Sequence, residues 1–448
     1  MKGYLPIDRE QRTEMLADVG IGIEDLFAAI PEEIRLRETD FAHLAQHGLS
    51  EMEIRREISA LADKNISTAD YDSYLGAGIY DHFTPAAVSH LIGRQEFLTA
   101  YTPYQAEISQ GTLRAIFEWQ SYICRLTGLD VSNSSMYDGA SAAAEAMLLA
   151  IRATRRDKVW ISGGLNPEYI DTIKTYLLPS GFTVEVGTVA ADGRTADMPT
   201  AGDYAAFLIQ SPNFYGVVED LAAFAEAAHA VGTLAAASCD PISLALLKRP
   251  GDLGIDIVSG EAQVLGVAQS FGGPALGYLA VKQKLMRQMP GRIAGETVDD
   301  AGNTAYVLTL QAREQHIRRE RATSNICSNQ ALLATAATIY LALQGRSGLR
   351  EVAEQSAARA IYLHDRLVAT GLFKSLYNAA YFREFALQPV GDLDLKELNR
   401  RLLDYKILGG LVLPEKAWLL AVTEKKSQAQ LDRLVAAVVE ITDQVVSQ

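Results

Sequence analysis

The chain has 448 residues, of which 48% are hydrophobic and 21% charged, a composition typical of a globular protein with two or three structural units. Its formal net charge of −14 argues against nucleic acids and anionic membranes as main partners, and no run of about 18 apolar residues predicts a membrane-spanning helix. The three cysteines lie far apart without metal-ligand spacing, so we expect no disulfide framework, no metal site and a cytoplasmic location.

Helix-start signals dominate the N-terminal part of the chain. Asp8 and Pro31 stand at two candidate helix starts, and Ser50 with Glu53 forms a capping box before the run IRREISALADKN. The start of the chain carries acidic residues and lacks the apolar core of a secretory signal. We expect residues 1–64 to form a helical arm that has too little apolar surface to fold alone and that covers the main body or a partner subunit.

From residue 71 the sequence becomes rich in glycine, tyrosine, threonine and proline, and a helix is predicted only from about residue 111. Its polar-aromatic part contains Tyr101, Thr102, Tyr104 and Gln105. Rigid donors on irregular backbone are typical of a binding wall, although a packed surface loop has the same composition.

A regular alternation of strands and helices follows. The turn SNSSMYDGAS leads into an alanine-rich helix whose N-terminus could hold a phosphate on free N–H groups. Between residues 158 and 281, apolar strand runs alternate with helical patterns, which predicts a mainly parallel sheet covered by helices.

The C-terminal third departs from this alternation. Residues 282–324 read as a glycine- and acid-rich loop followed by a basic helix, and residues 329–345 as another helix. Beyond them, helical and strand patterns predict a smaller α+β domain. We therefore expect a helical arm over 1–64, a large α/β domain over 65–345 and a small domain over 346–448.

Residues 233–281 have the outline of a site for pyridoxal phosphate (PLP). Asp240 ends a buried strand, where a carboxylate can keep a pyridine nitrogen protonated, and a Gly-Gly-Pro turn at 272–274 opens a later strand. The lysine that should precede this turn is missing, because none occurs between Lys248 and Lys282. Gln263 occupies its slot, to within about one residue by this spacing, and a carboxamide cannot form a Schiff base. The alternative is an unrelated α/β enzyme with a glycine-rich turn.

Six motifs, taken in their order along the chain, point to a specific protein family. They are YLGAGIYDHFTP, TAYTPYQAEISQGTL, DGASAAAEAM, DPISLALLKRPGDLGIDIVSGEAQ, SFGGPALG and REQHIRRERATSNICSNQAL. Together they resemble the subunit 1 family of glycine dehydrogenase (decarboxylating), the α subunit of the two-chain P-protein of the glycine cleavage system. The resemblance runs from about Pro6 to about Leu343 and weakens toward the C-terminus. It implies the fold-type I scaffold of PLP-dependent transferases, with a seven-stranded, mainly parallel sheet.

The resemblance also implies a function. A β subunit, subunit 2, would hold PLP covalently in an α2β2 assembly, and this chain would keep only a vestigial pocket of Asp240, Gln263 and Asn166.

 The family would place a stacked histidine where Asn166 stands. With the partner, the chain would decarboxylate glycine, release CO2 and pass the aminomethyl group to the lipoyl arm of the H carrier protein, with PLP as the electron sink.

Because fold-type I sites form at subunit interfaces, the resemblance implies that this chain supplies wall residues to its partner's PLP. The candidates lie in the polar-aromatic segment and in the turn before the helix at 329–345: Tyr101, Thr102, Tyr104, Gln105, Ser324, Asn325 and Cys327. Two alternatives stay open. One is a self-sufficient PLP transferase or lyase that uses Lys248 or Lys282, and the other is a subunit that only scaffolds its partner.

Overall fold

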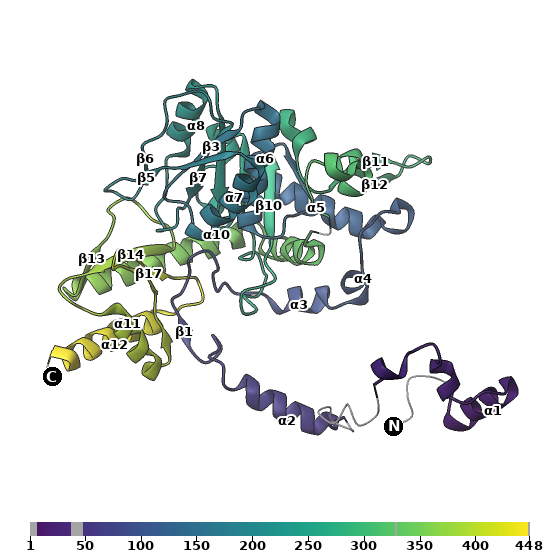
Figure 1. Ribbon diagram of the computed structural model, residues 1–448. Coiled ribbons are helices and arrows are strands. Elements are labelled where there is room, and N and C mark those ends of the chain that lie inside the picture. Colours follow the sequence, from purple (N-terminus) through teal and green to yellow (C-terminus); the bar gives the residue numbers. More distant parts are fainter. Residues whose placement is uncertain (1–6, 37–47, 328, 447–448) are drawn as a thin grey trace. The chain divides into compact units, whose positions relative to one another are not determined.

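The structure, a computed structural model, describes residues 7–36, 48–327 and 329–446 (Figure 1). The chain forms two compact units, residues 1–67 and residues 68–448. None of the helices in the described ranges combines the length and the hydropathy needed to cross a membrane. The predicted division of the larger unit near residue 345 remains a prediction.

Within its described residues, the first unit contains helices α1 (Arg9–Val19) and α2 (Glu51–Ala62) and two short 3-10 turns. The helix starts predicted at Asp8 and Ser50 are confirmed, because each side chain takes part in a complete capping box. Pro31 precedes only a 3-10 turn, Glu32–Ile34, and residues 37–47 of this stretch lie outside the described part. No residue of α1 or α2 is buried, so these two helices contribute no buried core.

A seven-stranded sheet forms the centre of the second unit (Figure 1). Five neighbouring strands, from β4 to β9, pair in parallel, and β10 runs antiparallel to both of its neighbours, β9 and β2. This confirms the predicted, mainly parallel sheet. In spatial order the strands are β2 (Val131–Ser132), β10 (Gly277–Val281), β9 (Ile257–Glu261), β8 (Leu234–Cys239), β7 (Ala206–Ser211), β3 (Lys158–Ile161) and β4 (Thr183–Val186).

Helices cover both faces of this sheet. Alternate residues of each strand point to opposite sides, so each face has its own set of apolar side chains to bury. Phe207 of β7 packs in one core cluster with residues of α5 (Gln110–Thr127), α8 (Leu221–Ala230) and α10 (Ala331–Ala369). Its neighbour Leu208 packs in the other cluster, with residues of α6 (Gly139–Thr154) and α7 (Pro167–Leu177). Five alanines of α6 are fully buried, which lets this helix approach the sheet closely: Ala142, Ala143, Ala144, Ala146 and Ala150.

The prediction for residues 282–324 is wrong in its main feature. A β-hairpin of β11 (Ile293–Val298) and β12 (Thr304–Thr309) replaces the expected loop, and only a four-residue helix, α9 (Gln315–Arg318), stands in place of the basic helix. The Asp299 carboxylate closes the hairpin turn by accepting the N–H groups of Ala301 and Asn303, both at or below 2.9 Å. Arg313 is turned inward onto backbone carbonyls, including that of Gly291.

The C-terminal part contains the predicted helices and strands. Gly345 has non-helical backbone angles (φ 58°, ψ −171°), so α10 is two helices joined at the predicted break. An antiparallel sheet follows, with α11 (Leu395–Leu402) and α12 (Gln428–Val446). Its strands are β13 (Phe373–Ser375), β14 (Glu384–Pro389), β17 (Trp418–Ala421) and β16 (Leu411–Val412).

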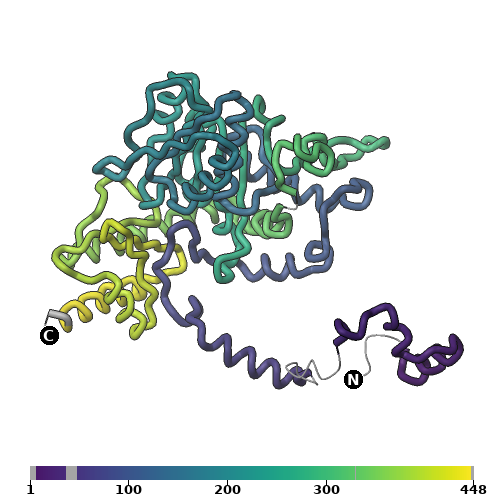
Figure 2. The backbone as a smooth tube through the Cα atoms, viewed as in Figure 1, coloured from purple at the N-terminus to yellow at the C-terminus, as the bar shows by residue number. Residues whose placement is uncertain are grey.

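The segment that opens the second unit runs beside this C-terminal sheet (Figure 2). There β1 (Asp72–Ser73) pairs in parallel with β15 (Ile407–Leu408). The remaining short elements are α3 (Ala86–Ile92), α4 (Gln95–Leu98), β5 (Thr188–Val189) and β6 (Thr195–Ala196). This pairing carries residues 74–83 to the carboxyl ends of the central strands, where the cavity described next lies.

Candidate functional site

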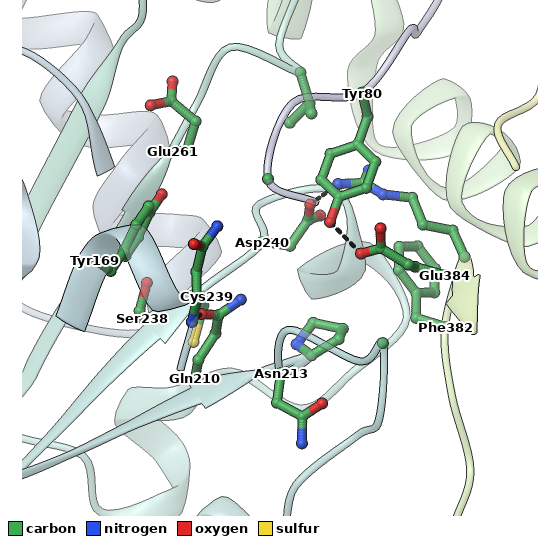
Figure 3. A pocket seen from close by; sticks show the side chains of 16 residues that line it. Tyr80, Tyr169, Gln210, Asn213, Ser238, Cys239, Asp240, Glu261, Phe382 and Glu384 are labelled. Carbon is green, nitrogen blue, oxygen red and sulfur yellow. Dashed lines mark hydrogen bonds and ion pairs between the residues drawn. The ribbon is translucent and has the colours of Figure 1, made fainter. Parts of the chain in front are cut away.

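A polar cavity of about 50 Å³ lies at the carboxyl ends of β7 and β8, the edge where open α/β sheets bind ligands (Figure 3). Residues 78–80, the start of α7 and the start of β14 complete its wall. The residues used below that line it are Tyr80, Asn166, Tyr169, Asp240, Glu261, Arg383 and Glu384.

Asp240 follows β8, as predicted, but its carboxylate is already paired. One oxygen accepts the Ser243 N–H at 2.9 Å, and the other forms an ion pair with Arg383. The Arg383 side chain is only 3% exposed, and its guanidinium lies 3.6 Å from the centre of the Tyr80 ring. Sequence reasoning missed Arg383, because the run FREFALQ carries only the signal of a strand.

A buried histidine continues this network. Arg383 Nη1 donates to Nε2 of His82 at 2.6 Å, and Nδ1 of His82 lies 2.6 Å from a carboxylate oxygen of Glu424. Burial lowers the pKa of His82, which favours the neutral ring with its proton on Nδ1. The chain Asp240–Arg383–His82–Glu424 therefore joins the central sheet to the C-terminal part by buried polar contacts.

Glu384, at the start of β14, lies beside Tyr80 and across the cavity from Tyr169 and Glu261 (Figure 3). Its carboxylate accepts the Tyr80 hydroxyl at 2.6 Å and the Ala77 N–H at 2.7 Å. Burial raises the pKa of Glu384 to about 7. Gly76 passes so close to this carboxylate that no side chain fits at its position. The cavity thus contains a carboxyl group that titrates near neutral pH.

Gln263 is a structural amide. Its side chain is buried, its Oε1 accepts the Tyr80 N–H at 3.2 Å, and its Nε2 donates to the carbonyl of Val267 at 2.7 Å. Neither of the two lysines that flank this stretch, Lys248 and Lys282, lines the cavity. Lys282 pairs with Asp256 at 3.0 Å, and Lys248 is exposed outside the cavity lining.

Asn166 does line the cavity, but as a cap of helix α7. Its Oδ1 accepts the Glu168 N–H at 3.0 Å, and its Nδ2 donates to the carbonyl of Ala77 at 3.1 Å. A small amide held at both ends offers no ring on which a cofactor could stack.

The second set of predicted residues lies elsewhere and gathers around Arg292. This buried guanidinium donates to the Tyr104 hydroxyl at 2.9 Å and to the carbonyl of Cys327, so it joins the two stretches that the sequence singled out. Ser324 is turned inward, and its hydroxyl donates to the buried Glu145 at 2.6 Å. Tyr101, Gln105 and Asn325 are exposed, and Thr102 is half-buried. Nothing in the sequence pattern around Arg292 indicated its role.

The chain is similar to known proteins over nearly its whole length. The family model for the glycine cleavage system P-protein matches residues 2–438. A protein of Desulforamulus reducens named "Probable glycine dehydrogenase (decarboxylating) subunit 1" is 48% identical over 443 residues, which are 97% of this chain and 98% of that protein. A protein of the same name from Listeria innocua is 47% identical over 445 residues, with coverages of 97% and 98%.

A comparison with solved structures supports the same family. An inhibitor-bound glycine decarboxylase (P-protein) of the glycine cleavage system superposes with a TM-score of 0.89 at 41% identity, covering 98% of this chain and 100% of that one. Glutamate decarboxylase of Lactobacillus brevis shares the fold alone, with a TM-score of 0.69 at 14% identity over 93% of this chain and 97% of that one. These matches confirm the predicted fold-type I architecture. The chain belongs to the glycine cleavage system P-protein family.

Proposed function

We propose that this chain is the subunit of a two-chain glycine dehydrogenase (decarboxylating) that lacks the cofactor lysine, and that subunit 2 holds PLP covalently. The observation that carries this proposal is the Gln263 amide, which stands where the sequence spacing predicts the lysine and is bonded to backbone at both ends. The relatives' name, subunit 1, supports the existence of a second subunit.

The residues of the cavity do not fit PLP. The cofactor needs an amine for its aldehyde and a free carboxylate for its pyridine nitrogen. Here Asp240 is paired with Arg383, Asn166 replaces a stacking ring, and no lysine stands among the described residues that line the cavity. We therefore assign PLP, which supplies an electron sink when bound, to the partner alone.

In the proposed reaction, glycine loses CO2 and its aminomethyl group passes to the lipoyl arm of the H carrier protein, on a cytoplasmic α2β2 assembly. The part of this chain would be to build one wall of the partner's site. Arg292 holds the Tyr104 hydroxyl beside the backbone of Cys327, and Asn325 is exposed on the same turn. Donors held rigidly on loops are suited to orient a carboxylate and to exclude water.

Borohydride reduction of the assembled complex, followed by peptide mass mapping of both chains, tests this assignment. We expect a phosphopyridoxyl-lysine on subunit 2 and none on this chain. A stoichiometric adduct on Lys248 or Lys282 would show instead that this chain is a self-sufficient PLP enzyme.

A further inference from the structure

Helix α6 begins at the cavity, and its first N–H groups were expected to be free for a phosphate. That prediction is wrong for Gly139 and Ser141, because acidic side chains of the same chain already accept their N–H groups. The Gly139 N–H donates to Oε2 of Glu261 at 2.9 Å, and the Ser141 N–H donates to the cap residue Asp138 at 2.7 Å. The partial positive charge of this helix end is therefore already matched by carboxylates.

Glu261, the last residue of β9, collects donors from three separate segments. Besides Gly139, its other oxygen accepts the N–H groups of Gln263 and of Leu276, each at 2.9 Å. An arrangement of backbone N–H groups converging on one anion from a helix start and two turns is how proteins bind phosphate. Burial raises the pKa of Glu261, and the three backbone donors act in the opposite direction. A carboxylate of the chain thus lies where a bound anion would lie.

Two further features close the same place to a phosphate. The Tyr169 hydroxyl lies so close to Gly139 that no side chain fits between them, so the tyrosine covers the helix end. The cavity lining also carries three carboxyl groups, on Asp240, Glu261 and Glu384, against the single guanidinium of Arg383. Above about pH 7, where Glu384 is ionised, a phosphate dianion would meet net negative charge there.

We propose that Glu261 is a built-in substitute for the cofactor phosphate: its carboxylate holds α6, the Gln263 turn and β10 together and closes this chain's pocket to phosphorylated ligands. The proposal goes beyond the missing lysine, because it states that the non-covalent part of PLP binding has been lost as well. It concerns this chain's own pocket and makes no assumption about how subunit 2 binds its cofactor.

The test measures binding of inorganic phosphate and of PLP to the full chain and to Glu261→Ala, by thermal melting at constant ionic strength. Wild type should show no saturable rise in Tm with either probe. In Glu261→Ala the three N–H donors lose their acceptor, so phosphate should restore it with a saturable rise of about 3 °C. Glu168→Ala is the matched control, because it removes an exposed carboxylate from the start of α7 instead.

Two outcomes would overturn the proposal. One is saturable binding of phosphate or PLP by wild type, with or without borohydride-reducible adduct. The other is a Glu261→Ala protein, folded by circular dichroism, that responds to phosphate no more than Glu168→Ala does. If Glu261→Ala does not fold, Glu261→Ser takes its place with the same criteria, because its short side chain also vacates the place of the carboxylate, and the wild-type measurement still decides the first outcome.

Discussion

Replacing Gln263 by lysine places an amine where the sequence spacing predicts the cofactor lysine, and the structure predicts that the main effect is a loss of stability. The Gln263 amide is 4% exposed and bridges the Tyr80 N–H and the Val267 carbonyl. A lysine can still donate to the carbonyl but cannot accept the N–H, so a buried donor is left unsatisfied and an ammonium is buried. An unsatisfied buried group costs about 1–3 kcal/mol, and the charge adds to this, so we expect a loss of roughly 2–5 kcal/mol.

Denaturant unfolding of the full chain, followed by fluorescence, measures this loss. Gln283→Lys is the matched control, because it makes the same substitution at an exposed position, and Gln263→Met separates the lost hydrogen bonds from the added charge. Absorption spectra with PLP should show no new aldimine band, and activity with saturating subunit 2 should stay near that of wild type. If Gln263→Lys is as stable as Gln283→Lys, or if it forms an aldimine, the interpretation of Gln263 as a structural amide is wrong.

Three other predictions concern the two groups of residues described above. Arg383→Met should lower the free energy of unfolding by about 3–5 kcal/mol, because Asp240 is left as an uncompensated charge; adding Asp240→Asn should recover part of this loss, and an additive double variant would refute the pairing. Glu384 binds its proton more tightly in the folded chain, with a pKa of about 7 against an ordinary 4.5, so its stabilising effect is complete below pH 4.5 and is lost as the pH rises through 7. Glu384→Gln should remove this slope, worth up to roughly 3 kcal/mol, from urea-unfolding curves measured between those pH values, and an unchanged slope would contradict it. Tyr104→Phe and Asn325→Ala, assayed with excess subunit 2, should each lower glycine–bicarbonate exchange by about 100-fold if they bind substrate or cofactor; wild-type rates in both would favour the scaffolding alternative.

Features that depend on near neighbours in the chain could be predicted from the sequence. The capping boxes at Asp8 and Ser50 join residues three positions apart. The continuous apolar runs of β7 and β8 predict strands that are buried on both faces. The break at Gly345 and the missing lysine are equally local. The hairpin of β11 and β12 was missed because glycine- and acid-rich turns resemble mobile loops, and only the packing of Leu308 against α5 shows that the flanking residues are strands.

What the tertiary structure alone decided is which polar groups meet. Asp240 and Arg383 are 143 residues apart, and Arg292 reaches Tyr104 across 188 residues, so no periodicity or spacing could pair them. The sequence by itself predicts that the Gln263 slot cannot form an internal aldimine, since that prediction needs only the identity of the residue there. That Gln263 is bonded to backbone and that Glu261 lies on the start of α6 depends on three distant segments converging at one edge of the sheet. Convergence of this kind is set by the order of the strands, which local patterns do not contain.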